Sequence, residues 1–388
     1  MSQSLSPRAH FPVLEQLTYL NTASIGLVPQ PVLEQALAFD QDIATRGTTG
    51  FDEEAETFAL EGARKAAADL FGSDPTSVTV GKAATETFCQ VAWSLRPAHG
   101  ANLVVIDIDH PSTVYPWVRA ARESGVEIRM ARVWDDPASL SIDLLERLVD
   151  DRTWAVAVSQ VQYSTGYRLD LRAVSDLAHA HGAVAAIDAT QAAGMAPIEV
   201  ATSGVDVLVA GGYKWLCGMF GASVGYVRPE LIERIDPPFA GWRSTPDPYT
   251  FDSRDLPLAP GARRLEYSTM SYGAAVGLGG AIEYVLDLGI SSVLEHDVAL
   301  ATELMLGLDE LEAEVLSSRV PEHMSGIVTA RFPGRDGERV ATRLNGDGVV
   351  VSPRFGATRF ALHHFNDSRD VQTALERLRG ILNTPDSD

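Results

Sequence analysis

The chain has 388 residues, of which 45% are hydrophobic and 21% are charged, and its formal net charge is −21 at pH 7. This length allows a substantial core and two domains, and the composition is that of an ordinary globular protein. The acidic balance argues against a broad surface for nucleic acids or anionic membranes, because both require clustered basic side chains.

The two cysteines, Cys89 and Cys217, are too few for a disulfide framework. The N-terminal sequence has no apolar run of the signal-peptide type, and no apolar stretch reaches the length of a membrane span. We therefore expect a cytoplasmic protein that binds neither membranes nor nucleic acids.

Apolar runs alternate with amphipathic helical patterns through the first two-thirds of the chain. Strands are predicted over residues 101–109, 126–133, 153–162, 183–188 and 205–211. Helices are predicted over residues 112–125, 142–151 and 169–182. Repeated strand–helix–strand units predict a parallel sheet that is covered on both faces, with a ligand site beyond the carboxyl ends of its strands.

The pattern changes after residue 236. Residues 237–262 are rich in Pro, Gly, Arg and Asp, which is typical of a long functional loop. A strongly helical stretch follows over about 272–311, and the remainder mixes strands and helices. We expect an N-terminal segment over 1–25, a large domain over 26–255 and a smaller α+β domain over 256–388.

Two charged residues stand at neighbouring strand ends. Asp188 follows an apolar run, and Lys214 follows the next predicted strand. A flat ligand between them would explain both, because pyridoxal phosphate pairs its pyridinium nitrogen with an aspartate and forms a Schiff base with a lysine.

A phosphate site is predicted where a strand-like segment ends at Gly81 and Thr85 begins a helix. Free N–H groups at a helix start, together with a hydroxyl, bind phosphate without a basic side chain. A simple helix cap by Thr85 is the alternative.

Eight segments, taken in order, resemble the class V aminotransferase family of pyridoxal phosphate enzymes. They are YLNTASIGLVPQPV, AATET, HPSTVYPW, VQYSTGYRLDL, DATQAAG, GGYKWLCG, LEYSTMSYGAAVGLGGAIEYVLDLGI and TRFALHHFND. This family includes cysteine desulfurases, C–S lyases, kynureninase and isopenicillin N epimerase. The resemblance implies the α/β fold of fold-type I enzymes, with a mostly parallel seven-stranded sheet in the large domain, a smaller C-terminal domain, and a homodimer with shared sites.

The resemblance also implies cofactor contacts. Lys214 is expected to form the Schiff base and to move the proton at the substrate Cα. Asp188 is expected to hold the pyridine nitrogen, and Gln191 is expected to bind the phenolic oxygen. The N–H group of Ala84 and the side chain of Thr85 are expected to bind the phosphate.

Three further positions complete the implied cofactor site. His110 stands where the family places an aromatic ring on the cofactor, with a packed or capping histidine as the alternative. Thr269 is expected to reach the phosphate of a partner subunit. Tyr213 stands where many relatives have Ser or His, and it is a candidate for a phosphate contact.

The substrate site is implied in the same way. Arg359 is expected to bind the substrate carboxylate in a bidentate pair, with Arg354 as its substitute. Tyr163 and Trp242 are candidates for the substrate pocket, and loop packing is the alternative for Trp242. No metal-ligand spacing occurs, so no metal is expected.

The reaction expected first is β-elimination from a cysteine S-conjugate, which gives a thiol, pyruvate and ammonia. Cysteine desulfurases instead attack the substrate sulfur with a thiolate on a mobile loop of the C-terminal domain, and this chain has no cysteine after Cys217. Transamination, epimerisation and decarboxylation remain alternatives, and a noncatalytic pyridoxal phosphate-binding protein is a remote one.

Overall fold

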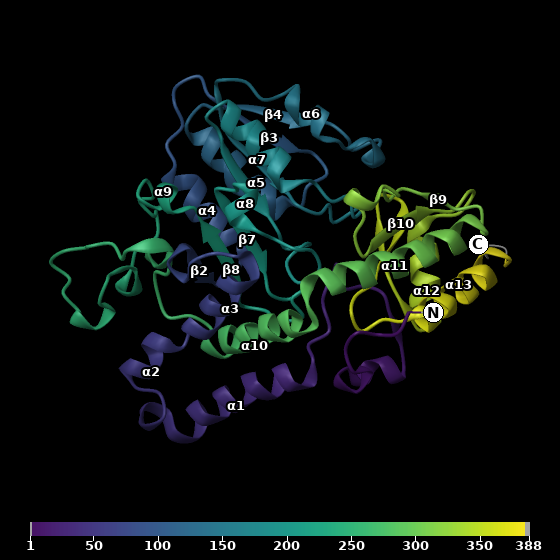
Figure 1. Cartoon of the computed structure of the whole chain (residues 1–388), viewed down its shortest axis with the longest axis horizontal. Coiled ribbons are helices and arrows are strands. Elements are labelled where there is room, and N and C mark those ends of the chain that lie inside the picture. The colour runs from purple at the N-terminus through teal and green to yellow at the C-terminus, as the bar shows by residue number, and fades with distance from the viewer. Residues whose placement is uncertain (1, 385–388) are drawn as a thin grey trace.

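A seven-stranded sheet forms the centre of the large domain in the computed structural model, which describes residues 2–384 (Figure 1). In spatial order the strands are β2 (Val78–Gly81), β8 (Ser223–Val227), β7 (Val207–Gly211), β6 (Val184–Asp188), β5 (Thr153–Ser159), β3 (Asn102–Ile106) and β4 (Glu127–Ala131). Strand β8 is antiparallel to both of its neighbours, and the other neighbouring pairs are parallel. The predicted α/β fold with a mostly parallel seven-stranded sheet is confirmed.

The inner strands are apolar along their length because helices cover both faces of the sheet. Every residue of β3, β5, β6 and β7 is buried. Strand β6 ends at Asp188 and β7 ends at Gly211, as predicted. Strand β5 ends at Ser159 rather than near Gln162, because the chain leaves the sheet there and Val161 makes an isolated bridge with Arg168.

The helices surround this sheet and the smaller one (Figure 1). They are α1 (Gln30–Arg46), α2 (Glu53–Phe58), α3 (Glu61–Phe71), α4 (Ala84–Ser94), α5 (Pro111–Glu123), α6 (Ile142–Glu146), α7 (Leu171–Ala180), α8 (Val200–Ser203), α9 (Pro229–Ile232), α10 (Tyr272–Leu288), α11 (Ile290–Asp309), α12 (Gly337–Gly346) and α13 (Ser368–Leu382).

The helical stretch expected over 272–311 is divided at Gly289, whose φ of 80° favours glycine. Helix α10 packs on α1 and α3, whereas α11 packs on α13 and β10. These contacts favour a domain boundary near Gly289, and the boundary at 255/256 stays a prediction. Among the described residues no single helix is long and apolar enough to cross a membrane, and only α10 and α11 together, bent by 75°, pass that test.

The small domain is built on an antiparallel sheet of β12 (Ser352–Arg354), β13 (Ala357–Ala361), β10 (Ile327–Arg331) and β9 (Glu314–Val315), in that order. Strand β1 (Thr18–Tyr19) of the N-terminal segment pairs with β11 (Val349–Val350) of the small domain. The two ends of the chain therefore lie on the same domain, at the right of Figure 1.

Strands β12 and β13 are joined by a two-residue turn, Phe355–Gly356, between the paired residues Arg354 and Ala357. Both turn residues have positive φ, 50° and 72°, as in the tight turns that match the twist of two strands. This hairpin has no additional loop between its strands.

Candidate active site

A cavity of about 190 Å³ opens beyond the carboxyl ends of β5, β6 and β7. The residues that line it are Lys82, Ala83, Ala84, Thr85, His110, Ser112, Ser159, Tyr163, Asp188, Thr190, Gln191, Gly211, Tyr213, Lys214, Phe220, Gly221 and Ala222. Eight of the residues expected to contact a cofactor or substrate are therefore brought together in one chain: Ala84, Thr85, His110, Tyr163, Asp188, Gln191, Tyr213 and Lys214.

Lys214 follows β7 in a turn and is 8% exposed. The pKa of its ammonium group is lowered to about 8. Burial is the main cause, the negative charge of Asp188 opposes it, and the positive charges of Arg359 and Arg354 contribute to the lowering. A lysine with such a pKa is partly deprotonated near neutral pH, so its amine can act as a nucleophile or as a base.

The lowered pKa predicts a pH profile. When the cofactor-free protein is mixed with pyridoxal phosphate, the rate of covalent attachment to Lys214 should rise with pH and reach its midpoint near pH 8. The direction follows because only the deprotonated amine attacks an aldehyde. Stopped-flow absorbance at several pH values measures this rate, and a midpoint near 10.5, the ordinary value for lysine, would contradict the assignment.

Asp188 ends β6 and is 6% exposed. Its Oδ2 accepts a hydrogen bond of 2.7 Å from the Thr113 hydroxyl, and its Oδ1 accepts one of 2.8 Å from the N–H group of Thr190. These two donors hold the side chain in one orientation in the cavity wall.

Gln191 links the Lys214 loop to the N-terminal segment. Its Oε1 accepts from the Trp215 indole N–H at 2.7 Å, and its Nε2 donates to the carbonyl oxygen of Ala23 at 3.0 Å. The N–H group of Gly26 also donates to the Tyr213 carbonyl oxygen at 2.8 Å. A Cβ at Gly26 would collide with the carbonyl oxygen of Lys214, so this close approach requires glycine.

Helix α4 points its N-terminus into the cavity. Its N-cap residue, Ala83, has no side-chain oxygen to accept from the first turn. Within residues 2–384, the N–H groups of Ala84 and Thr85 make no hydrogen bond. Unpaired N–H groups at a helix start, beside the Thr85 hydroxyl, form an anion site.

His110 both caps a helix and lines the cavity. Its Nδ1 accepts from the N–H group of Ser112 at 3.2 Å, which caps α5. Its ring meets the ring of Tyr163 edge to face at 5.5 Å between centroids. Burial, and next the positive charge of Lys214, lower the pKa of His110, so it is held neutral and available for ring stacking.

Tyr213 lies beside Phe220 at the rim of the cavity. The two rings are stacked at 4.7 Å between centroids, and Phe220 is 61% exposed. Burial raises the pKa of the Tyr213 hydroxyl. Its place among the lining residues is consistent with the predicted phosphate contact, which stays a prediction.

Arg359 lies on β13 and is fully buried. Its Nη1 donates to the Tyr163 carbonyl oxygen at 2.6 Å, its Nη2 donates to the Ser24 hydroxyl at 2.7 Å, and its Nε has no partner among the described residues. Burial, and next the charge of Arg354, lower the pKa of Arg359 to about 9. A cation without a carboxylate partner at such a place is suited to an anionic ligand.

Trp242 and Thr269 do not line this cavity within one chain. Trp242 lies in the long loop, in a separate surface groove formed by residues 241–256, and meets Tyr249 edge to face at 5.6 Å. Thr269 precedes α10 and is exposed. The roles predicted for both residues stay predictions.

Several cavity residues were not predicted from the sequence, among them Lys82, Ser112, Ser159, Thr190 and Phe220. Thr190 lies two residues after the end of β6, and Ser159 ends β5. Their positions at strand ends are therefore the sequence signal that could have identified them as cavity residues. Phe220 carries no such signal in the sequence, because it is an apolar residue and does not follow a strand end directly.

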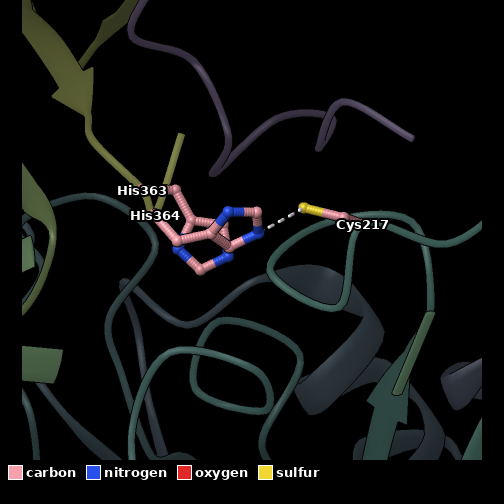
Figure 2. A group of neighbouring side chains, drawn as sticks. All are labelled: Cys217, His363 and His364. Carbon is pink, nitrogen blue, oxygen red and sulfur yellow. Dashed lines mark hydrogen bonds between the residues drawn. The ribbon is translucent and has the colours of Figure 1, made fainter. Parts of the chain in front are cut away.

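Cys217 stands three residues after Lys214, is buried, and faces His364 of the small domain (Figure 2). Its Sγ lies 3.7 Å from Nε2 of His364. Burial, and next the charge of Asp297, raise the pKa of the Cys217 thiol far above its usual value. Cys217 therefore packs as a protonated thiol, as predicted for a buried cysteine.

Cys217, His363 and His364 offer three possible metal-ligand atoms within 4.8 Å of one another (Figure 2). Both nitrogens of His363 are already used, since Nδ1 lies 2.8 Å from Oδ2 of Asp297 and Nε2 donates to the Trp215 carbonyl oxygen at 2.8 Å. These contacts describe a hydrogen-bonded junction between the Lys214 loop and the small domain.

The family model for aminotransferase class-V matches residues 18–371. A probable cysteine desulfurase of Synechocystis sp. is 25% identical over 411 residues, which cover 98% of this chain and 96% of that protein. Among solved structures, a C-DES mutant with glycine covalently linked to the PLP cofactor has a TM-score of 0.87 at 24% identity and covers 96% of this chain and 99% of that chain. A complex of the cystine C–S lyase C-DES with its reaction product cysteine persulfide has a TM-score of 0.85 at 24% identity and covers 95% and 98%.

The donor set of the cavity fits pyridoxal phosphate. The unpaired N–H groups at the start of α4 suit a phosphate, the oriented carboxylate of Asp188 suits a pyridinium nitrogen, and the amine of Lys214 suits an aldehyde. With the family match over most of its length, the chain belongs to the aminotransferase class-V family and is an enzyme that uses pyridoxal phosphate.

Proposed function

We propose that this enzyme cleaves the C–S bond of a cysteine S-conjugate by β-elimination, releasing a thiol and 2-aminoacrylate, which water converts to pyruvate and ammonia. The observation that carries the proposal is the pairing of a buried Lys214 of lowered pKa with a cavity wall that contains no cysteine among the described residues. The amine of Lys214 can accept the Cα proton, and no thiol in the cavity wall can accept sulfur from the substrate.

Bound pyridoxal phosphate supplies the electron sink that acidifies the Cα proton of the substrate. Lys214 accepts that proton, the C–H electron pair forms the Cα–Cβ double bond, and the sulfur leaves with the electron pair of the C–S bond. Arg359 binds the α-carboxylate, and the donors Thr113 and Thr190 hold the Asp188 side chain in position.

The positions of both thiols support elimination over sulfur transfer to the enzyme. Cys217 is fully buried against His364, Cys89 lies on α4, and neither is among the residues that line the cavity. The β12–β13 hairpin turns in two residues, and no cysteine follows Cys217. A thiolate on a mobile loop of the small domain, as cysteine desulfurases use, has no counterpart in this sequence.

Transamination, epimerisation and decarboxylation are the alternatives, because each also begins on an amino acid held by Lys214 and Arg359. The reaction is tested by incubating the holoenzyme with S-substituted cysteines and with other amino acids, without an added keto acid. Release of thiol and pyruvate in equal amounts supports elimination. Strict dependence on a keto acid acceptor, with no thiol released, would overturn it.

A double variant, Cys89→Ala with Cys217→Ala, should keep its rate of thiol release within about threefold of the wild type, because neither thiol contacts the cavity. Circular dichroism and thermal unfolding check that the variant is folded, since Cys217 is buried. A loss of 100-fold or so in a folded double variant would instead indicate a thiol in the reaction and favour a desulfurase.

We also propose that the enzyme is a homodimer in the cytoplasm. Thr269 and Trp242 lie away from the cavity of their own chain, and the exposed ring of Phe220 stands at the cavity rim. A second subunit would cover that ring and bring the two residues to a site, and sedimentation of the holoenzyme tests the assembly.

A further inference from the structure

Two arginines project from the same face of the β12–β13 hairpin. Ser352 lies directly opposite Arg359, and Arg354 is two residues from Ser352 along β12, so the three side chains share one face. Hydrogen bonds confirm part of this arrangement, because the Ser24 hydroxyl contacts both Ser352 and Arg359.

This face meets the cavity wall at Tyr163, although neither Arg354 nor Arg359 is itself among the lining residues. The Tyr163 carbonyl oxygen accepts from Arg359 at 2.6 Å, and the ring of Phe355, next to Arg354, lies 6.2 Å from the ring of Tyr163. The positive charge of Arg354 lowers the pKa of both Lys214 and Arg359, as expected for groups that face one site.

The charges of this region are not balanced. Within residues 2–384, neither Arg354 nor Arg359 forms an ion pair with a carboxylate, and Arg354 donates only to the carbonyl oxygen of Pro353. Among the described residues Asp188 is the one carboxylate of the cavity wall, and Thr113 and Thr190 already donate hydrogen bonds to it. A single substrate carboxylate on Arg359 would leave Arg354 half-buried and without a counter-charge, which is unfavourable.

The surroundings of Arg354 suit a ligand group at the mouth of the site. Phe355 meets Trp134 edge to face at 4.7 Å, and Trp134 is 58% exposed. Phe355 is the residue after Arg354, which is itself half-buried, and partial removal of water strengthens a charged hydrogen bond.

We propose that the substrate carries a second acidic group on its leaving side, and that Arg354 binds this group while Arg359 binds the α-carboxylate. The inference rests on the proposed elimination reaction and narrows its substrates to cysteine S-conjugates with an anionic thiol fragment. Arg354 is then a residue that determines specificity.

Two nearly isosteric substrates test this directly. S-carboxymethyl-L-cysteine and S-carbamoylmethyl-L-cysteine differ in charge and little in shape. The wild-type kcat/KM should be about tenfold or more higher for the carboxymethyl compound. In Arg354→Gln the two compounds should have about the same kcat/KM. Arg354→Lys should restore part of the difference, and Arg331→Gln, which alters a partly exposed arginine on β10 of the same sheet, should leave it unchanged.

If Arg354→Gln lowered kcat/KM equally for both substrates, the two arginines would bind the same carboxylate, and this would overturn the inference. If the wild type cleaved both compounds with similar kcat/KM, this would also overturn the inference, whereas the proposed elimination reaction would be supported.

Binding measured by calorimetry separates the inference from the reaction. Succinate should bind the holoenzyme about tenfold more tightly than succinamate, and Arg354→Gln should remove the difference. If no S-conjugate is cleaved but this difference is observed, the elimination reaction fails and the paired-arginine site stands. Equal binding of both compounds by the wild type would count against the site.

Discussion

Replacing Lys214 by alanine should abolish the covalent attachment of pyridoxal phosphate and lower turnover by about 1000-fold or more. Two functions are lost at once, because the same amine is proposed to bind the cofactor aldehyde and to take the Cα proton. Its burial beside Asp188 and its pKa of about 8 are the physical basis of both functions.

This chain allows a sharp measurement of that prediction because it contains only three lysines, Lys65, Lys82 and Lys214. Borohydride reduction of the holoenzyme, followed by digestion and mass spectrometry, should find the cofactor on Lys214 alone. Lys65→Ala is the matched control, since Lys65 is exposed on α3 and its loss should leave the label in place.

Lys82 is the informative competitor in the same experiment. It also lines the cavity, with its Nζ 5.1 Å from the centre of the Tyr267 ring. A label on Lys82 in the wild type, or a label that persists in folded Lys214→Ala, would show that Lys214 is not the attachment residue.

Replacing Asp188 by asparagine should lower kcat on the order of 100-fold to 1000-fold while leaving the fold intact. Asparagine keeps the shape of the side chain, and Thr113 can reorient its hydroxyl to accept from the new amide. The lost charge can no longer stabilise a protonated pyridine nitrogen, so the electron sink becomes weaker.

Cofactor absorbance, thermal unfolding and steady-state rates together measure this effect. Asp109→Asn is the comparison variant, because Asp109 is also a buried carboxyl at a strand end, with its pKa raised to about 7 by burial. It accepts from Gln162 at 2.6 Å and does not line the cavity, so its change in kcat should stay below about tenfold. Similar losses in both variants would indicate a general effect of buried charge.

Much of the large domain could be predicted because its signals are local. Apolar runs bounded by glycine or polar residues mark buried strands of a parallel sheet, and the chain ends β6 at Asp188 and β7 at Gly211 where the patterns end. Since the carboxyl ends of parallel strands share one edge, Asp188 and Lys214 were expected in one cleft, and both line the same cavity.

The sequence by itself thus determined the sheet, the strand-end residues and, through motif order, the family and its cofactor. Only the tertiary structure decided which distant residues meet. The pairing of Ser24 and Tyr163 with Arg359, the burial of Cys217 under His364, and the Thr113 contact to Asp188 join segments whose separations carry no periodic signal. Such contacts depend on how the two domains and the N-terminal segment pack against one another. That packing is determined by the shape and charge of surfaces formed by residues from distant parts of the chain.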